Sequence, residues 1–186
     1  MVTTGEGGAC VTDDAALADR LRVLRNHGQR AAGVFEVPAG NQRLTEVAAA
    51  IGLAQLARLE AILARRRALA ERYLAALADR FEVQHAPEGA RSNRQTFGVV
   101  LPPSCTARER DALVSLLRER GIESGRLSYA LSRVGSLIGK VAGGPLPVAE
   151  GIDERGLALP LHPLLEEADV EAVLEAFEAS VAEVLP

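Results

Sequence analysis

The sequence has 186 residues, of which 48% are hydrophobic and only 3% aromatic, and its formal net charge is -4. This charge argues against a nucleic-acid partner, because nucleic-acid-binding domains normally carry a basic face. No apolar run approaches the ~20 residues of a membrane span, and the N-terminus lacks the pattern of a signal peptide. Cys10 and Cys105 have neither metal nor redox spacing. We therefore expect a cytoplasmic α/β protein with no metal site and no membrane partner.

The N-terminal part is predicted to contain a strand, a helix and a loop. Residues 8–12 are small and apolar, which favours a short buried strand. Asp13 and Asp14 are candidate N-caps of a helix that ends near Gly28. Residues 29–40 contain several turn-forming residues and are predicted to form a loop.

A helical apolar pattern covers residues 45–79 and is free of proline. A single helix of this length would be about 50 Å long at about 1.5 Å per residue. Because such a length is unusual within one compact domain, the pattern predicts a helix that spans two domains or lies on a partner. The other side of this helix carries five arginines that we expect to be solvated: Arg58, Arg65, Arg66, Arg67 and Arg72.

Residues 80–186 alternate between strand and helix patterns, which is typical of a two-layer α/β domain. Strands are expected at residues 81–84, 95–101 and 157–161, with a short edge strand at 122–124. Thr106 and Glu109 match a capping box that opens one helix, and a last helix is expected near 166–184. The glycine-rich residues 125–146 are left without an assignment.

Four segments follow one another in an order and spacing that identify a family. They are Thr3-Thr4-Gly5-Glu6-Gly7-Gly8, Leu24-Arg25-Asn26-His27-Gly28, Asn41-Gln42-Arg43-Leu44-Thr45-Glu46 and Leu159-Pro160-Leu161-His162-Pro163. Together they resemble the DegT/DnrJ/EryC1/StrS family of nucleotide-sugar aminotransferases, which depend on pyridoxal phosphate (PLP).

The resemblance implies an α/β fold that corresponds to the C-terminal part of a fold-type I PLP aminotransferase. Residues 1–44 would be a remnant of the PLP-binding large domain, including its last strand and helix. Residues 45–79 would form the long connecting helix, and residues 80–186 a small C-terminal α/β domain.

The resemblance also implies that the catalytic lysine is missing, since the family has it three residues before the first threonine of the first motif. That position lies one residue before Met1. PLP chemistry needs an amine that reacts with the cofactor's aldehyde and then moves the substrate proton. Lys140 is the sole lysine of the sequence, and it is expected to be a solvated loop residue. We therefore assign no catalytic residue and expect the chain alone to be inactive and to bind PLP weakly or not at all.

Three residues are carried over from the family as candidate site residues. Asn41 is implied to contact the PLP phosphate of a neighbouring subunit, and Arg43 to lie toward the sugar nucleotide. An amide N–H and a guanidinium both suit phosphate oxygens, although the residues by themselves also fit a turn asparagine and a helix-start arginine. Tyr129 is interpreted as a shifted substrate-binding residue, because Arg126 to Tyr129 departs from the family's pattern.

Three interpretations of the chain remain open. It can be a fragment of an aminotransferase, or one half of a split enzyme whose other chain supplies the lysine and PLP. It can also be a non-catalytic pseudoenzyme or dimerisation module. The expected partners are accordingly a second copy of the chain or a missing N-terminal half.

Overall fold

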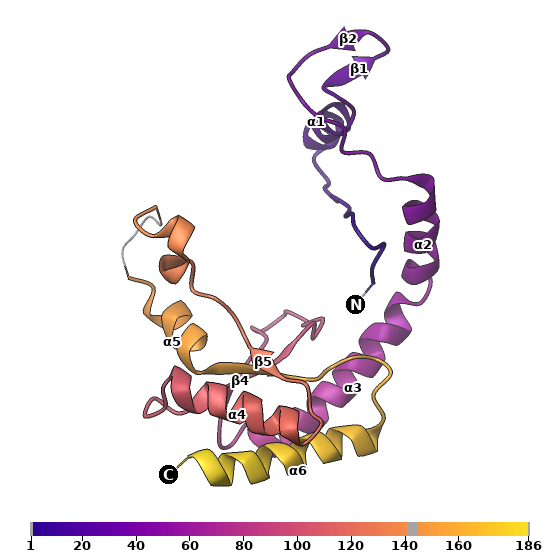
Figure 1. Cartoon of the computed structure of the whole chain (residues 1–186). Helices are drawn as coiled ribbons and strands as arrows, with labels where there is room; N and C mark the ends of the chain where they lie inside the picture. Colours follow the sequence, from indigo (N-terminus) through magenta and orange to yellow (C-terminus); the bar gives the residue numbers. More distant parts are fainter. Residues whose placement is uncertain (1, 141–144, 186) are drawn as a thin grey trace. The chain divides into compact units, whose positions relative to one another are not determined.

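The computed structural model describes residues 2–140 and 145–185 of the chain (Figure 1). The chain divides into two compact units, Met1–Glu60 (unit 1) and Ala61–Pro186 (unit 2). Within the described residues no single helix is both long and apolar enough to cross a membrane, although the helices Glu46–Leu56 and Leu59–Leu77 together, across the bend between them, reach that length and composition.

Unit 1 begins with the expected glycine turn and helix. Gly5 and Gly7 both have positive φ, which glycine adopts without strain. Helix α1 spans Ala15–Arg25 and is capped by Asp14, whose Oδ1 accepts hydrogen bonds from the backbone N–H groups of the first turn. The helix ends in left-handed backbone at His27 and Gly28, with φ of 57° and 73°.

The predicted loop at residues 29–40 contains a short antiparallel hairpin, β1 (Gln29–Ala31) and β2 (Val34–Phe35). Gly33 supplies a positive φ of 77° in its turn. Arg30 braces the hairpin by pairing with Glu36 and, at 2.7 Å, with Asp19 of α1. The carboxylates of Glu36 and Asp19 raise the pKa of Arg30.

The strand predicted at residues 8–12 is not formed. The segment has no regular secondary structure, and Val11 is 96% exposed. A strand forms only when neighbouring backbone pairs with its N–H and C=O groups, and no other described segment forms a ladder with residues 8–12. The prediction was wrong because residue pattern alone cannot supply a partner strand.

The single helix predicted over residues 45–79 is instead two helices, α2 (Glu46–Leu56) and α3 (Leu59–Leu77). Thr45 caps α2, as its Oγ1 accepts from the N–H of Ala48 at 3.2 Å. At the break the N–H of Arg58 donates to Gln55 O at 3.1 Å, which tightens the last turn to an i to i+3 bond. No glycine or proline marks this position, so the sequence pattern does not reveal the interruption.

Unit 2 contains an antiparallel sheet with strand order β3-β4-β6-β5 (Figure 1). The strands are β3 (Glu82–Val83), β4 (Phe97–Val100), β5 (Gly125–Arg126) and β6 (Gly156–Leu159). The two central strands pair Phe97 with Leu159 and Val99 with Leu157. The short edge strand is present, but it lies one residue beyond the predicted range of 122–124.

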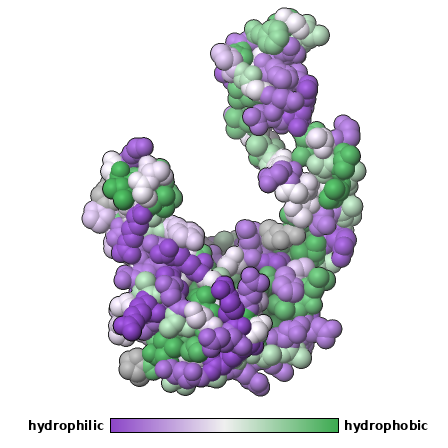
Figure 2. Space-filling model, in the orientation of Figure 1, coloured by the Kyte–Doolittle hydropathy of each residue, from purple (hydrophilic) through white to green (hydrophobic). Residues whose placement is uncertain are grey.

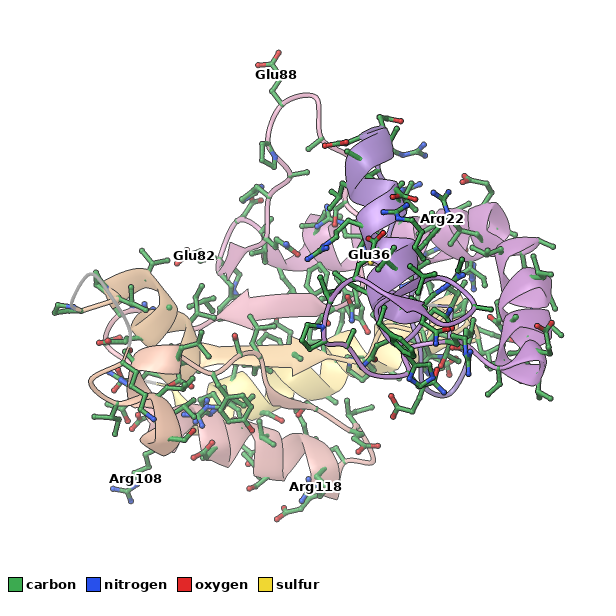
Figure 3. All side chains as sticks on the ribbon, turned by 90° about the horizontal axis from the view of Figure 1, so that it is seen from above. Arg22, Glu36, Glu82, Glu88, Arg108 and Arg118 are labelled. Atoms are coloured by element: carbon green, nitrogen blue, oxygen red, sulfur yellow. The ribbon has the colours of Figure 1, made fainter. Side chains whose placement is uncertain are left out.

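Helices α4 (Ala107–Glu119) and α6 (Glu167–Val184) confirm the two predicted helices of this unit. The capping box at Thr106 and Glu109 is formed, and these hydrogen bonds hold the pKa of Glu109 below its usual value. Arg108 and Arg118 project outward from α4, as Figure 3 shows. The segment that the sequence left unassigned contains two short 3-10 turns, Leu131–Arg133 and Gly135–Leu137. It is followed by a further helix, α5 (Pro147–Arg155).

The core of unit 2 lies between one face of the sheet and helices α3, α4 and α6. Tyr73 of α3 packs on Phe97 of β4 with ring centroids 4.8 Å apart, and Phe81 packs edge-on against Phe177 of α6. The hydroxyl of Tyr73 donates to Pro160 O at 2.9 Å, and burial raises the pKa of this tyrosine. The two-layer arrangement predicted for this region is therefore present.

Arg66 of α3 contradicts the prediction that the arginines of this helix are solvated. Its side chain is buried, with 3% of the residue exposed, and its guanidinium donates to the backbone carbonyls of Arg94, at 2.9 Å, and Gln95. Burial lowers the pKa of Arg66. The carbonyl groups replace water as hydrogen-bond acceptors, which makes burial of the guanidinium tolerable.

The arginines on either side of Arg66 also bond to backbone rather than only to solvent. Arg65 donates to Leu165 O at 2.7 Å, and Arg67 donates to Ser92 O at 2.9 Å. Three consecutive side chains of α3 thus hold the loop at residues 92–95 and the chain that precedes α6.

Candidate functional site

Asn41 and Arg43 lie on a loop between β2 and α2 that pairs with the end of α1. Asn41 forms an isolated antiparallel bridge with Asn26. Two further backbone hydrogen bonds flank the bridge, from His27 N to Gly40 O (3.0 Å) and from Gln42 N to Arg25 O (2.9 Å). The second and third sequence motifs are therefore in contact within unit 1.

The side chains of Asn41 and Arg43 are each held by a local hydrogen bond. The Oδ1 of Asn41 accepts from the backbone N–H of Arg43 at 3.1 Å, so its Nδ2 is left as a donor. One guanidinium nitrogen of Arg43 donates to Asn26 Oδ1 at 2.8 Å. Both residues are exposed. The arrangement presents an amide N–H group and a guanidinium to a ligand that brings hydrogen-bond acceptors.

A hollow of about 430 Å³ beside Arg43 is lined largely by arginines. Arg30 is neutralised by Asp19 and Glu36, whereas Arg22, Arg25 and Arg43 have no ion-pair partner among the described residues. The donors and the excess positive charge fit the phosphate of PLP or of a nucleotide.

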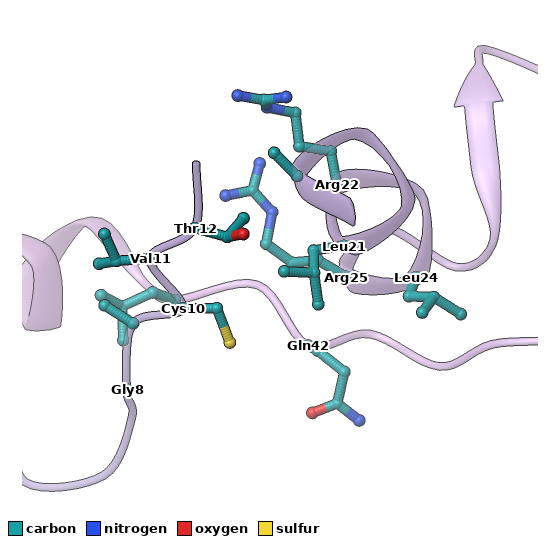
Figure 4. Close-up of a pocket in the computed structure, with 12 residues that line it drawn as sticks. Gly8, Cys10, Val11, Thr12, Leu21, Arg22, Leu24, Arg25 and Gln42 are labelled. Carbon is teal, nitrogen blue, oxygen red and sulfur yellow. The ribbon is translucent and has the colours of Figure 1, made fainter. Parts of the chain in front are cut away.

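A second hollow, of about 640 Å³, lies between residues 8–12 and α1 (Figure 4). Its wall combines backbone that forms no ladder with the side chains of Leu21, Leu24 and Leu44. Cys10, which is exposed, also lines it. Backbone without a hydrogen-bonded partner beside exposed apolar side chains is typical of a surface on which further protein can pack.

Tyr129 belongs to unit 2 and follows the edge strand β5. It is 66% exposed. The guanidinium of Arg126 lies over its ring, with Cζ 4.7 Å from the ring centroid, and Arg126 pairs in turn with the buried Asp153. Sequence reasoning missed Asp153, because an acidic residue within residues 147–155 resembles an ordinary surface position.

Lys140, the sole lysine, is exposed and lies beyond the second 3-10 turn of unit 2. Its backbone N–H donates to Leu137 O at 2.9 Å, and its side chain forms no ion pair with a described residue. Among residues 2–140 and 145–185, no three His, Cys, Asp or Glu side chains are grouped so as to hold a metal ion.

The fold is similar to known aminotransferase structures. The aminotransferase TlmJ from Streptoalloteichus hindustanus superposes with a TM-score of 0.83 and 34% identity, over 100% of this chain and 50% of that chain. A sugar aminotransferase from Streptococcus pneumoniae, Spr1654, superposes with a TM-score of 0.82 and 26% identity, over 96% and 46% of the two chains. These neighbours confirm the predicted fold class, the C-terminal part of a fold-type I PLP aminotransferase.

The sequence comparisons agree with the structural ones. The sequence pattern of the DegT/DnrJ/EryC1/StrS aminotransferase family matches residues 1–178. GDP-perosamine synthase of Caulobacter vibrioides is 33% identical over 96% of this chain and 49% of its own length. The dTDP-3-amino-3,4,6-trideoxy-alpha-D-glucose transaminase of Micromonospora megalomicea is 36% identical over 92% of this chain and 47% of its own length.

The chain belongs to the DegT/DnrJ/EryC1/StrS aminotransferase family, as its motifs predict. It spans about half the length of the curated relatives that it matches.

Proposed function

We propose that this chain supplies the C-terminal half of a PLP-dependent aminotransferase that transfers an amino group from an amino acid to a keto-sugar nucleotide. The observation that carries the proposal is that the loop of Asn41 and Arg43 is fixed to the end of α1 by the Asn26–Asn41 bridge and the Arg43–Asn26 hydrogen bond, while both residues stay exposed. The proposal is supported by membership in an aminotransferase family. It is also supported by two relatives whose names refer to sugars linked to GDP or dTDP.

Each candidate residue has one task in this proposal. The Nδ2 of Asn41 donates to the phosphate of PLP, and the guanidinium of Arg43 binds a phosphate of the sugar nucleotide. The hydroxyl of Tyr129 contacts the sugar nucleotide. When bound, PLP supplies an electron-withdrawing ring and an aldehyde that carries the amino group.

In the proposal this chain does not transfer amino groups by itself. Its one primary amine on a side chain is that of Lys140, which is exposed in a loop of unit 2. Arginine cannot take over the chemistry, because its guanidinium remains protonated. The proposed active form therefore also contains an N-terminal half that provides the reacting lysine, and we propose that it is a cytoplasmic oligomer.

The first experiment tests whether the chain acts alone. The purified chain is incubated with PLP, reduced with borohydride and examined by mass spectrometry, and its turnover with glutamate and a keto-sugar nucleotide is measured. We expect no PLP attached to Lys140 and no turnover, with the Caulobacter GDP-perosamine synthase as the positive control. Turnover by the purified chain contradicts the proposal.

The second experiment tests Asn41 in a complete enzyme. The chain replaces the corresponding C-terminal part of the Micromonospora transaminase, and amino transfer by this chimera is measured. Replacing Asn41 by Ala is expected to lower the rate about tenfold or more, the effect of losing a hydrogen bond to a charged group.

Asn93→Ala is the matched control, because Asn93 Oδ1 accepts from the N–H of Gln95 at 3.0 Å in the same local geometry as Asn41. If the Asn41 and Asn93 variants retain equal activity, Asn41 does not bind the cofactor. An inactive chimera that still forms a well-folded dimer favours the second candidate function.

That second candidate is a non-catalytic dimerisation module. The observation that favours it is the exposed apolar surface of α2, which has no buried residue. Sedimentation and PLP absorbance of the chimera separate the two: a stable dimer that binds no PLP, even with an N-terminal half present, favours the module.

A further inference from the structure

Asp153 is the one carboxylate residue that is buried among the residues that the structure describes. It lies in the last turn of α5, and its side chain is 3% exposed. Burying a carboxylate destabilises the folded chain unless opposite charges or hydrogen-bond donors lie beside it. The groups around Asp153 are therefore what makes its burial tolerable.

Three arginines converge on Asp153 from different parts of unit 2. The Nε–H of Arg126 donates to the backbone carbonyl of Asp153 at 3.1 Å, and the same nitrogen lies 2.8 Å from Oδ1 as an ion-pair contact. Oδ1 accepts no hydrogen bond from a described residue, and Arg133 lies 4.0 Å from Oδ2. Arg110 of α4 is also buried and donates to the backbone carbonyl of Asp153 at 2.8 Å. Of these partners, Arg126 has the shortest contact with the carboxylate.

The other side of the Arg126 guanidinium faces Tyr129, whose ring centroid is 4.7 Å from its Cζ. A guanidinium stacks favourably on an aromatic face. Because the Nε of Arg126 is fixed by Asp153, the plane on which the tyrosine stacks is fixed as well. The Tyr129 hydroxyl has no hydrogen bond to a described residue and so is free to meet a ligand.

Leu127, which follows Arg126, is anchored on the sheet. Leu127 lies against Gly98 and Gly156: a Cβ at Gly98 would come within 2.5 Å of Leu127 Cδ2, and one at Gly156 within 3.0 Å of Leu127 Cβ. The N–H of Leu127 donates to Gly156 O at 3.0 Å. Beyond Leu127 no regular structure holds the chain until Leu131, so the stack with Arg126 orients Tyr129.

We propose that Asp153 is a positioning residue: its buried carboxylate fixes Arg126, and Arg126 holds the ring of Tyr129 so that its hydroxyl faces a bound ligand. This inference rests on the proposed function insofar as that ligand is the sugar nucleotide. The orientation of Tyr129 itself is a property of this chain and can be measured without the ligand.

The test uses the full chain labelled with 3-fluorotyrosine. The sequence has two tyrosines, Tyr73 and Tyr129, so two fluorine resonances are expected, and Tyr129→Phe assigns them. Asp153→Asn removes the charge that holds Arg126. It is expected to move the Tyr129 resonance toward that of free 3-fluorotyrosine and to narrow it, while the resonance of the buried Tyr73 stays in place.

Asp111→Asn is the matched control, since Asp111 also pairs with an arginine, Arg110, at 2.6 Å but is 70% exposed. It should leave both resonances unchanged. Arg126→Gln removes both the contact with Asp153 and the contact with Tyr129, at a residue that is less buried than Asp153. If Asp153→Asn also shifts the Tyr73 resonance, which would indicate a disturbed core, the Arg126 variant alone tests whether this arginine orients Tyr129. A Tyr129 resonance that is unchanged in both the Asp153 and the Arg126 variants overturns the proposal.

A kinetic measurement on the chimera separates this inference from the proposed function. Tyr129→Phe and Asp153→Asn should each raise KM for the keto-sugar nucleotide more than they lower kcat, and the double variant should add little to the larger single effect. If Tyr129→Phe has no kinetic effect, the substrate contact proposed for Tyr129 is wrong. The fluorine resonances still decide whether Asp153 orients the ring.

Discussion

Unit 2 closes a hydrophobic core of its own, whereas unit 1 leaves most of its large apolar side chains exposed. In unit 2, Tyr73, Leu113 and Phe177 are completely buried between the sheet and its helices. In unit 1, Val23 is the one described hydrophobic residue that is buried. Unit 1 is held instead by backbone pairing at Asn41 and by the ion pairs of its hairpin.

The difference teaches that apolar composition does not by itself make a core. Helix α2 is almost entirely apolar, yet Val47 and Leu53 are 73% and 70% exposed. Figure 2 shows hydrophobic residues at the surface over this helix. Burial requires a second layer, and within unit 1 no described segment provides one over α2. Four matched pairs of variants test this contrast.

The largest effect is expected for Leu113→Ala on α4. This leucine is fully buried, so its truncation should lower the free energy of unfolding by about 2–5 kcal/mol. Leu53→Ala on α2 should change it by about 0.5 kcal/mol or less. Urea unfolding of the two variants measures both values. Equal destabilisation would show that unit 1 has a core after all.

Arg66→Ala should lower the free energy of unfolding by about 2–3 kcal/mol, because it leaves two loop carbonyls without their charged donor. Arg58→Ala, at the exposed break between α2 and α3, should be close to neutral. Thermal unfolding compares the two. If both variants unfold like the original chain, the buried guanidinium does not stabilise unit 2.

Gly28→Ala tests the backbone pairing of unit 1. Gly28 and Gly33 have similar positive φ, 73° and 77°, so alanine strains both. Only at Gly28 does a Cβ meet backbone, 1.7 Å from Val37 O. Gly28→Ala should therefore cost about 1–3 kcal/mol more than Gly33→Ala. The backbone pairing between the end of α1 and the loop of Asn41 is measured by hydrogen exchange of the Gln42 and His27 amides, which should be faster in the Gly28 variant. Similar protection of these amides in both variants contradicts the prediction.

The smallest effect concerns acid stability and Glu109. Its capping hydrogen bonds hold its pKa in the folded chain below the ordinary value of 4.5. The stabilisation is thus fully present above pH 4.5 and is lost as the pH falls through the lower folded-state pKa. In Glu109→Gln the free energy of unfolding should therefore fall less steeply as the pH is lowered. Glu119→Gln, at the other end of α4, should show the same pH dependence as the original chain. Unfolding curves between pH 3 and pH 6 separate the two.

Features that depend on neighbouring residues were predicted well from the sequence. The capping box at Thr106, strand β4 and the apolar stripe of α6 all follow from spacing within one element. Features that depend on contacts between residues far apart in the sequence were not predicted. The burial of Arg66 requires the loop at residues 92–95, and a strand at residues 8–12 requires a partner strand.

The candidate site divides in the same way. Asn41 and Arg43 were found because they belong to a contiguous motif, and the structure adds that this motif pairs with the end of α1. Asp153 was missed, because its partner Arg126 lies 27 residues away in the sequence. No local pattern distinguishes a buried carboxylate in α5 from a surface one.

The three consecutive arginines of α3 also limit how this chain can vary. Successive side chains of a helix point about 100° apart, so Arg65, Arg66 and Arg67 reach three separate sets of carbonyls. Inserting or deleting one residue between Arg67 and Leu69 would rotate all three relative to the buried side chains that follow them, and so away from their acceptors at once. A change in helix length at this point would therefore remove all of these backbone contacts together, whereas substitution of one arginine removes only its own.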